Sequence, residues 1–172
     1  GGGGGAAWSD AGTICPWTIY RAYGDRRALE EHYDAMQRFV KYRRGVARPG
    51  PIAPARFHCF GDWLSIGAKT PKDVIWMAYT AASVRNTARA AEVLGKKAEA
   101  EEYYKFYEDI KASFNKNYID TQDHVKGDTQ CCYVLALAYD LVEGERWKRA
   151  ADRLIEKVKA KNWHLSTGFI GT

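Results

Sequence analysis

Tryptophan and aspartate side chains lie close together at two places in this sequence, in Trp8-Ser9-Asp10 and in Asp62-Trp63. An indole ring can cover the apolar face of a sugar, while a carboxylate accepts hydrogen bonds from the sugar's hydroxyl groups. The combination indicates a carbohydrate-binding site. The alternative is that the aspartates cap helices and the tryptophans pack beneath loops, and it stays open for each residue taken alone.

Three further polar side chains are weaker candidates for the same site. Asp128 and Gln130 lie in Gly127-Asp128-Thr129-Gln130, and His164 begins the stretch His164-Leu165-Ser166-Thr167-Gly168-Phe169. These stretches come before an expected helix, or where another helix would begin. Loops on a rigid scaffold commonly hold binding sites, so the set as a whole favours one shared site.

The spacing of apolar residues predicts six helices that must position these loops. Three segments are apolar on nearly all sides, and three carry one apolar stripe on an otherwise charged surface. The apolar segments cover residues 13–23, 71–94 and 129–142, and the charged ones cover 26–44, 97–118 and 145–161.

The joints between these segments follow a pattern. Gly24, Gly95 and Gly144 each come after an apolar segment and before a charged one, where a left-handed backbone ends a helix. Thr70-Pro71-Lys72-Asp73 predicts the start of the second apolar helix. In that motif Thr70 caps, proline fits the first turn and Asp73 takes the acidic position of a capping box.

A helix that is apolar all round must be buried on most sides, whereas one with a single stripe lies outside. The alternation therefore predicts an all-α fold of inner helices ringed by outer ones, in three hairpins. Short glycine turns form one rim, and the long connections 45–70, 119–128 and 162 onward form the other. A curved hairpin array or part of an α/α toroid would have this form, and a generic helical bundle or solenoid is the alternative.

Composition argues against several other classes of protein. No apolar run approaches the ~20 residues that a membrane helix needs. The net charge is +5, but acids and bases alternate along the same stretches, which does not indicate a nucleic-acid partner. The four cysteines have neither CxxC nor zinc-finger spacing, so no metal site or disulfide framework is predicted. No cofactor is expected either.

The N-terminal residues are expected to lie outside the folded domain. Residues 1–6 are expected to be a glycine-rich linker or tag, and residues 7–172 a partial domain. The first residues lack the basic and apolar regions of a signal peptide. The compartment therefore stays open, with the cytoplasm favoured. The native N-terminus of the protein is expected to be missing from this sequence.

Four ordered motifs resemble the catalytic domain of bacterial α-L-rhamnosidases of glycoside hydrolase family 78. They are WSDAGTICPWTIYRAYGDRRALEEHYDAM, CFGDWLSIGAKTPKD, KGDTQCCYVLALAYDL and HLSTGFIGT, and the resemblance covers about Ala7 to Thr172. It implies an (α/α)6 toroid whose substrate pocket lies on the rim with the long loops. It also implies hydrolysis of terminal α-L-rhamnosides in the complete enzyme, with inversion and without a metal-dependent step.

The resemblance implies roles for particular residues of this sequence. The family's W-G-D-A motif corresponds to Trp8-Ser9-Asp10-Ala11, with serine in place of the usual glycine, and its G-D-W-L motif to Gly61-Asp62-Trp63-Leu64. It implies that Trp8 and Trp63 line the rhamnose pocket, Trp63 near the methyl group of the sugar. The remaining substrate-binding candidates, chosen by motif and loop position, are Asp10, Asp62, Asp128, Gln130 and His164.

The family's general acid and general base are not found in this sequence. Inverting glycosidases place two such carboxyl groups on either side of a water molecule. The resemblance puts the acid in an R-D-E-R-L-G-W-T-G-D stretch before W-G-D-A and the base after S-T-G-F, and neither stretch occurs here. No catalytic residue is therefore predicted, and we expect little or no hydrolysis by this chain alone.

Three hairpins would form half of a six-hairpin ring. The exposed edges of its inner helices favour association with the rest of the domain or with a second copy. Two rival functions stay open, namely a non-catalytic helical-repeat module that binds a protein, and another α/α-toroid glycosidase or lyase. Unequal hairpin lengths argue against the first, and GDWL with HLSTGF argues against the second.

Overall fold

The computed structural model describes residues 5–172, which form six α-helices and no β-strand. The helices are α1 (Ala11–Tyr23), α2 (Arg26–Val46), α3 (Lys72–Val93), α4 (Lys97–Asn117), α5 (Gln130–Ala138) and α6 (Gly144–Lys159). Residues 1–4 of the expected linker lie outside the described residues. Ala6, at the end of that linker, is fully buried and donates its N–H to the carbonyl of His58.

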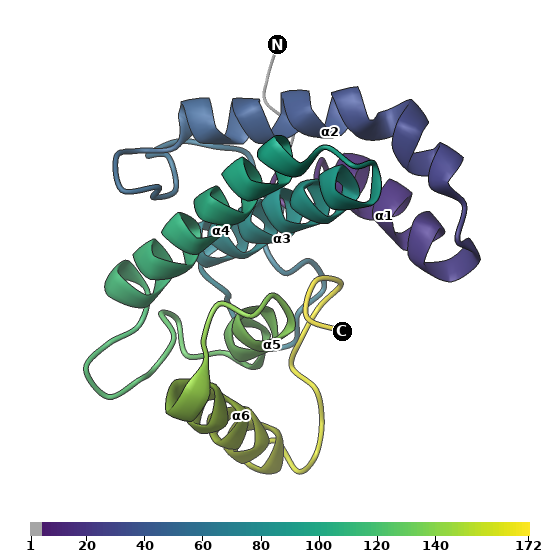
Figure 1. The fold of residues 1–172 in the computed structure, drawn as a ribbon. Coiled ribbons are helices and arrows are strands. Elements are labelled where there is room, and N and C mark those ends of the chain that lie inside the picture. Colours follow the sequence, from purple (N-terminus) through teal and green to yellow (C-terminus); the bar gives the residue numbers. More distant parts are fainter. Residues whose placement is uncertain (1–4) are drawn as a thin grey trace.

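The helices pack as three consecutive hairpins, α1 on α2, α3 on α4 and α5 on α6. The α1–α2 hairpin lies at one end of the molecule and the α5–α6 hairpin at the other, with α3 and α4 between them (Figure 1). α3 also contacts α1 and α5, so the three apolar helices follow one another as an inner row. The expected all-α fold of inner and outer helices is confirmed.

The core of the molecule is built around α3. Because α3 is apolar on nearly all sides, it is buried along most of its length, and small side chains such as Ala78, Ala81 and Ala88 let its neighbours approach closely. The amphipathic helices α2 and α4 each bury one face, whereas α6 fully buries only Ala150 and leaves Trp147, expected in its buried stripe, 46% exposed. Phe114 of α4 and Met36 of α2 are fully buried, for example.

α1 is much more exposed than an inner helix was expected to be. Only Thr13 and Pro16 are buried, whereas Ile19 is 42% and Tyr23 82% exposed. In the described chain α1 packs on α2 and α3 alone, so its remaining surface meets solvent. α1 therefore carries more apolar side chains than its neighbouring helices bury.

Three of the expected helix ends are wrong. α5 ends at Ala138 rather than near residue 142, because Asp140 adopts a left-handed backbone with φ of +52° and Leu141 donates to the carbonyl of Ala136. Thr70 does not cap α3, since its hydroxyl is 2.9 Å from the hydroxyl of Thr129 instead. Gly144 ends no helix, because it is the first residue of α6, well after the end of α5. The glycine termination is confirmed at Gly24, which has φ of +67° and donates to Tyr20.

Candidate functional site

Trp8 and Trp63 lie together on the rim that carries the long loops. Their ring centroids are 6.5 Å apart, and the Trp8 ring also lies 5.0 Å from Phe60 and 5.7 Å from Phe169, on which it stacks. Trp63 and Phe169 are 57% and 72% exposed. Three separate stretches of the sequence thus form one aromatic cluster, exposed except for the half-buried Trp8, which we call the rim cluster (Trp8, Phe60, Trp63 and Phe169).

Trp8 is held by a turn that is anchored on a buried ion pair. One carboxylate oxygen of Asp10 accepts from the N–H of Ala7 at 2.9 Å and from the guanidinium of Arg43 at 2.6 Å. The other accepts from the hydroxyl of Ser83 at 2.7 Å. Asp10 is fully buried and Arg43 is 2% exposed, so α2 and α3 together fix the turn that carries Trp8.

Trp63 is held by the C-terminal loop. The Asp62 carboxylate accepts from the N–H groups of Gly168 at 2.8 Å, Ile170 at 3.0 Å and Gly171 at 3.3 Å. The carbonyl of Trp63 accepts from the N–H of Phe169 at 2.7 Å. Asp62 is 7% exposed, and its hydrogen bonds join the two loops that carry Trp63 and Phe169.

Gln130 connects this loop to the start of α5. Its side-chain amide donates to the carbonyls of Lys157 and His164, both at 3.2 Å, and its oxygen accepts from the N–H of Ser166 at 2.8 Å. With 2% of its surface exposed, Gln130 is a buried bridge between α5, α6 and the C-terminal loop.

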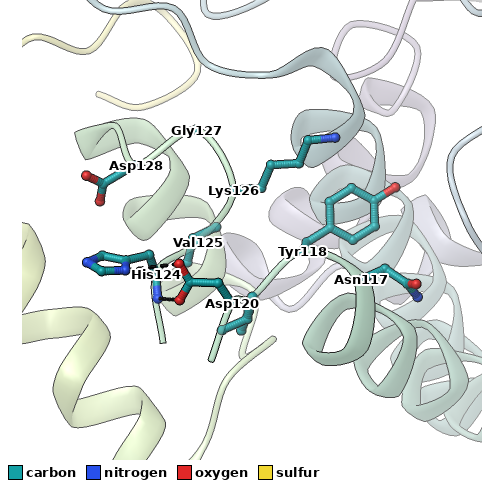
Figure 2. A pocket seen from close by; sticks show the side chains of 9 residues that line it. Asn117, Tyr118, Asp120, His124, Val125, Lys126, Gly127 and Asp128 are labelled. Atoms are coloured by element: carbon teal, nitrogen blue, oxygen red, sulfur yellow. Dashed lines mark hydrogen bonds and ion pairs between the residues drawn. The ribbon is translucent and has the colours of Figure 1, made fainter. Parts of the chain in front are cut away.

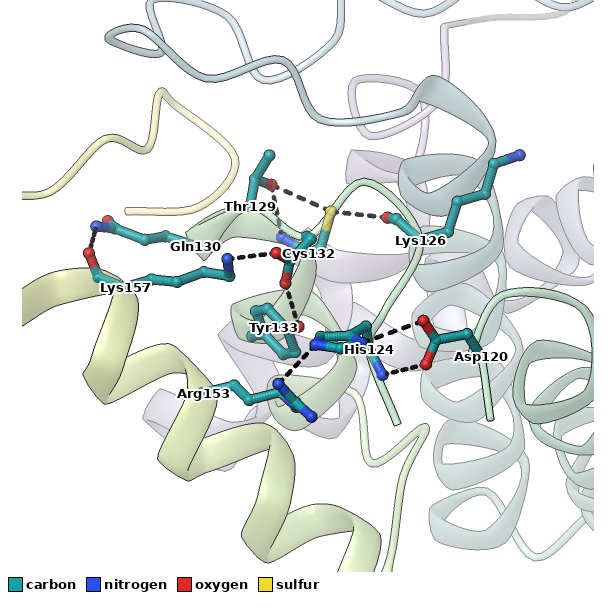
Figure 3. Close-up of polar contacts among 10 residues, drawn as sticks. Asp120, His124, Lys126, Thr129, Gln130, Cys132, Tyr133, Arg153 and Lys157 are labelled. Atoms are coloured by element: carbon teal, nitrogen blue, oxygen red, sulfur yellow. Dashed lines mark hydrogen bonds and ion pairs between the residues drawn. The ribbon is translucent and has the colours of Figure 1, made fainter. Parts of the chain in front are cut away.

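The two remaining candidates lie on the α6 side of the rim. Asp128 accepts from the Lys157 ammonium at 2.6 Å and from the Tyr133 hydroxyl. Partial burial opposes the charge of Asp128, but these two donors lower its pKa below the ordinary value. His164 is exposed, and its Nδ1 lies 3.0 Å from the carbonyl of Lys161. Figure 3 shows Asp128's partners Lys157 and Tyr133 beside Gln130.

A separate pocket of about 530 Å³ lies along residues 117–128 (Figure 2). In it the Asp120 carboxylate accepts from the backbone N–H of His124 at 2.8 Å and lies 3.1 Å from its Nδ1. The Nε2 of His124 lies 2.7 Å from Arg153 of α6, as Figure 3 also shows. Because these groups are bonded to one another, they link the 118–128 loop to α6.

The described residues show neither a metal-binding cluster nor a membrane-spanning helix. Within residues 5–172, no group of three or more His, Cys, Asp or Glu side chains is arranged to hold a metal ion. None of the helices described there is both long and apolar enough to cross a membrane. All four cysteines are free, and burial raises the pKa of the Cys131 and Cys132 thiols, consistent with small packed side chains.

The model for the bacterial α-L-rhamnosidase six-hairpin glycosidase domain matches residues 1–172. This chain belongs to that family. An α-L-rhamnosidase of Streptomyces avermitilis is 43% identical over 99% of the chain, and one of Formosa agariphila is 36% identical over 97%. The chain spans only 16% and 19% of the length of these relatives.

Solved structures of the rhamnosidase family give the same result. The S. avermitilis enzyme in complex with L-rhamnose is 43% identical with a TM-score of 0.91, covering 98% of this chain and 16% of its own. The Aspergillus terreus enzyme is 28% identical with a TM-score of 0.92, covering all of this chain and 21% of its own. The predicted family and the hairpin fold are both confirmed.

Sequence reasoning missed three residues that form or support the rim cluster. Phe60 and Phe169 belong to the rim cluster, and the only available signal was their position inside the CFGDW and HLSTGF motifs. Arg43, in the last turn of α2, is buried against Asp10. A long-range ion pair between positions 33 residues apart leaves no local pattern to detect.

Proposed function

We propose that this chain supplies part of the sugar-binding rim of an α-L-rhamnosidase-type domain, with Trp8 and Trp63 against the rhamnosyl ring. The rim cluster carries this proposal, because the half-buried ring of Trp8 and the exposed ring of Trp63, from separate motifs, meet there at 6.5 Å. Such rings can cover an apolar sugar face. A relative that is 43% identical was solved in complex with L-rhamnose, which supports this choice of sugar.

The polar candidates divide into two roles in this proposal. Asp10, Asp62 and Gln130 position the loops, since their side-chain oxygens already accept hydrogen bonds from this chain. His164 is exposed and is a candidate for contacts with sugar hydroxyls. Asp128 is exposed as well, although its two oxygens accept from Lys157 and Tyr133, so it would contact a sugar in addition to these partners.

For the complete enzyme we propose inverting hydrolysis of terminal α-L-rhamnosides. A general acid would protonate the leaving oxygen, and a general base would activate water. Because neither of the family's two glutamate stretches occurs in these 172 residues, the chain alone would bind sugar without cleaving it. Its partners would be the rest of such a domain, or a second copy, on the exposed face of α1.

Calorimetric titration of the chain with L-rhamnose tests this role. We expect saturable binding that Trp63→Ala weakens at least tenfold, roughly 1.4 kcal/mol, because a stacking ring is removed. Trp147→Ala on the outer helix α6 is the matched control, since Trp147 is also exposed at 46% but lies outside the rim cluster. Equal affinity for rhamnose in the wild type and Trp63→Ala would contradict the proposal.

A second measurement tests the absence of catalysis. We expect no nitrophenol release when the pure chain is incubated with 4-nitrophenyl α-L-rhamnoside. Sustained turnover that survives repeated purification would show that the chain does contain an acid and a base.

A further inference from the structure

A groove of about 540 Å³ adjoins the rim cluster. It is lined by residues 60–62, Ser65 and residues 68–72, where the long loop meets the start of α3. Phe60 belongs to both, because it lines the groove and its ring lies 5.0 Å from that of Trp8. A group attached to a sugar at the rim cluster could therefore extend past Phe60 into this groove.

Most polar side chains of the groove are already bonded within the chain. Asp62 accepts from three backbone N–H groups of the C-terminal loop. The hydroxyl of Thr70 pairs with that of Thr129, and the hydroxyl of Ser65 donates to the carbonyl of Ala68 at 2.8 Å. These groups hold the groove in shape and offer little to a ligand.

Two ammonium groups are the exception. Lys69 and Lys72 are exposed, and neither forms an ion pair or side-chain hydrogen bond with the rest of residues 5–172. The neighbouring carboxylate of Asp73 is neutralised by Lys126 at 2.5 Å. Asp62, the carboxylate within the lining, is 7% exposed and bonded by backbone donors. The accessible charge of the groove is therefore positive.

We propose that this groove binds a carboxylate on the group linked to the rhamnosyl unit, with Lys69 and Lys72 as its partners and Phe60 against the adjoining ring. The inference rests on the proposed rhamnose-binding role of the rim cluster. An aromatic wall beside two unpaired ammonium groups suits either a uronic acid or an aromatic acid, since both present a flat apolar face next to a carboxylate.

The decisive experiment compares two probes of the same shape, 4-carboxyphenyl and 4-carbamoylphenyl α-L-rhamnoside, by calorimetric titration at low salt. We expect the charged probe to bind roughly three- to tenfold more tightly, as exposed ion pairs of this kind allow. The double variant Lys69→Met, Lys72→Met should remove that difference. Lys148→Met on α6 is the matched control, because Lys148 is also exposed but lies far along the chain from the groove.

The outcomes separate the two proposals. Equal binding of both probes, with loss of both in Trp63→Ala, overturns the carboxylate inference and leaves the rhamnose proposal intact. A preference for the charged probe that persists in the double lysine variant also overturns the inference. Binding of neither probe overturns both. Rhamnosyl-glucuronate against rhamnosyl-glucose repeats the comparison and shows which acid, sugar or aromatic, gives the larger preference.

Discussion

At the residue scale, the central feature is the buried pair between Asp10 and Arg43. Removing two charges from water is costly, and the pair offsets that cost only with further hydrogen bonds. Ser83 and the Ala7 N–H supply them to Asp10, and the guanidinium of Arg43 lies over the rings of Phe39 and Trp76. Because Ala7 precedes Trp8, this charge pair determines where the indole lies.

Breaking the Asp10–Arg43 pair should strongly destabilise the fold. We expect Arg43→Met to lower the free energy of unfolding by about 3–5 kcal/mol, because it leaves a buried carboxylate without its counter-ion. Urea unfolding followed by circular dichroism measures this. Arg26→Met, which removes the exposed Arg26–Glu30 pair, should cost at most about 1 kcal/mol. Similar small losses in both variants would contradict the anchoring role.

At the scale of elements, the C-terminal loop and the loop before α3 behave as one unit. Four hydrogen bonds join Asp62 and Trp63 to residues 168–171. Gly168 sits at their closest approach, where a Cβ would overlap the Trp63 carbonyl oxygen and lie 2.6 Å from the Ser65 nitrogen. Only a residue without a side chain permits this backbone contact.

Gly168→Ala should therefore displace the C-terminal loop. We expect a loss of roughly 1–3 kcal/mol in stability from the backbone overlap, together with weaker rhamnose binding as Phe169 and Trp63 move apart. Gly45→Ala is the matched control, because a Cβ on that residue of α2 meets nothing within 4 Å and should be neutral or stabilising by up to about 1 kcal/mol. Thermal unfolding and titration measure both effects. Unchanged binding in Gly168→Ala would show that the loop contact does not position the rings.

At the scale of the whole molecule, ion pairs join the last hairpin to its surroundings. Ala150 is the one α6 residue that is fully buried in the described chain, while Asp128 pairs with Lys157, and Asp123 with Arg146 and Arg149. Hydrogen bonding from Arg146 lowers the pKa of Asp123, and Lys157 and Tyr133 lower that of Asp128 against its partial burial.

Acid should weaken this attachment. A carboxyl group whose pKa is lower when folded stabilises the fold above its ordinary value of 3.8, and this contribution is lost as the pH falls toward the folded pKa. We expect Asp128→Asn to cost about 0.5–1 kcal/mol at pH 6 and distinctly less at pH 2.5, measured by thermal unfolding. Asp152→Asn, an exposed α6 residue outside these pairs, is the control. An equal loss at both pH values would exclude the charged pair as the cause.

The sequence by itself determined the helices, their pairing into hairpins and the motifs that identify the family. These follow from local information, because apolar periodicity decides which face of a helix is buried and glycine marks where α1 and α3 end. It also selected Trp8 and Trp63, whose neighbours form recognisable motifs. The sequence did not predict where α5 ends, because the residue with the left-handed backbone there is Asp140 and not a glycine.

Only the tertiary structure decided what each candidate side chain does. Asp10 and Asp62 resemble ligand-binding carboxylates in the sequence, yet folding places Arg43 against the first and the amides of the C-terminal loop against the second. The groove beside Phe60 likewise depends on a loop and a helix start meeting in space. The reason is physical: a carboxylate's availability depends on partners that lie distant in the chain and leave no local pattern.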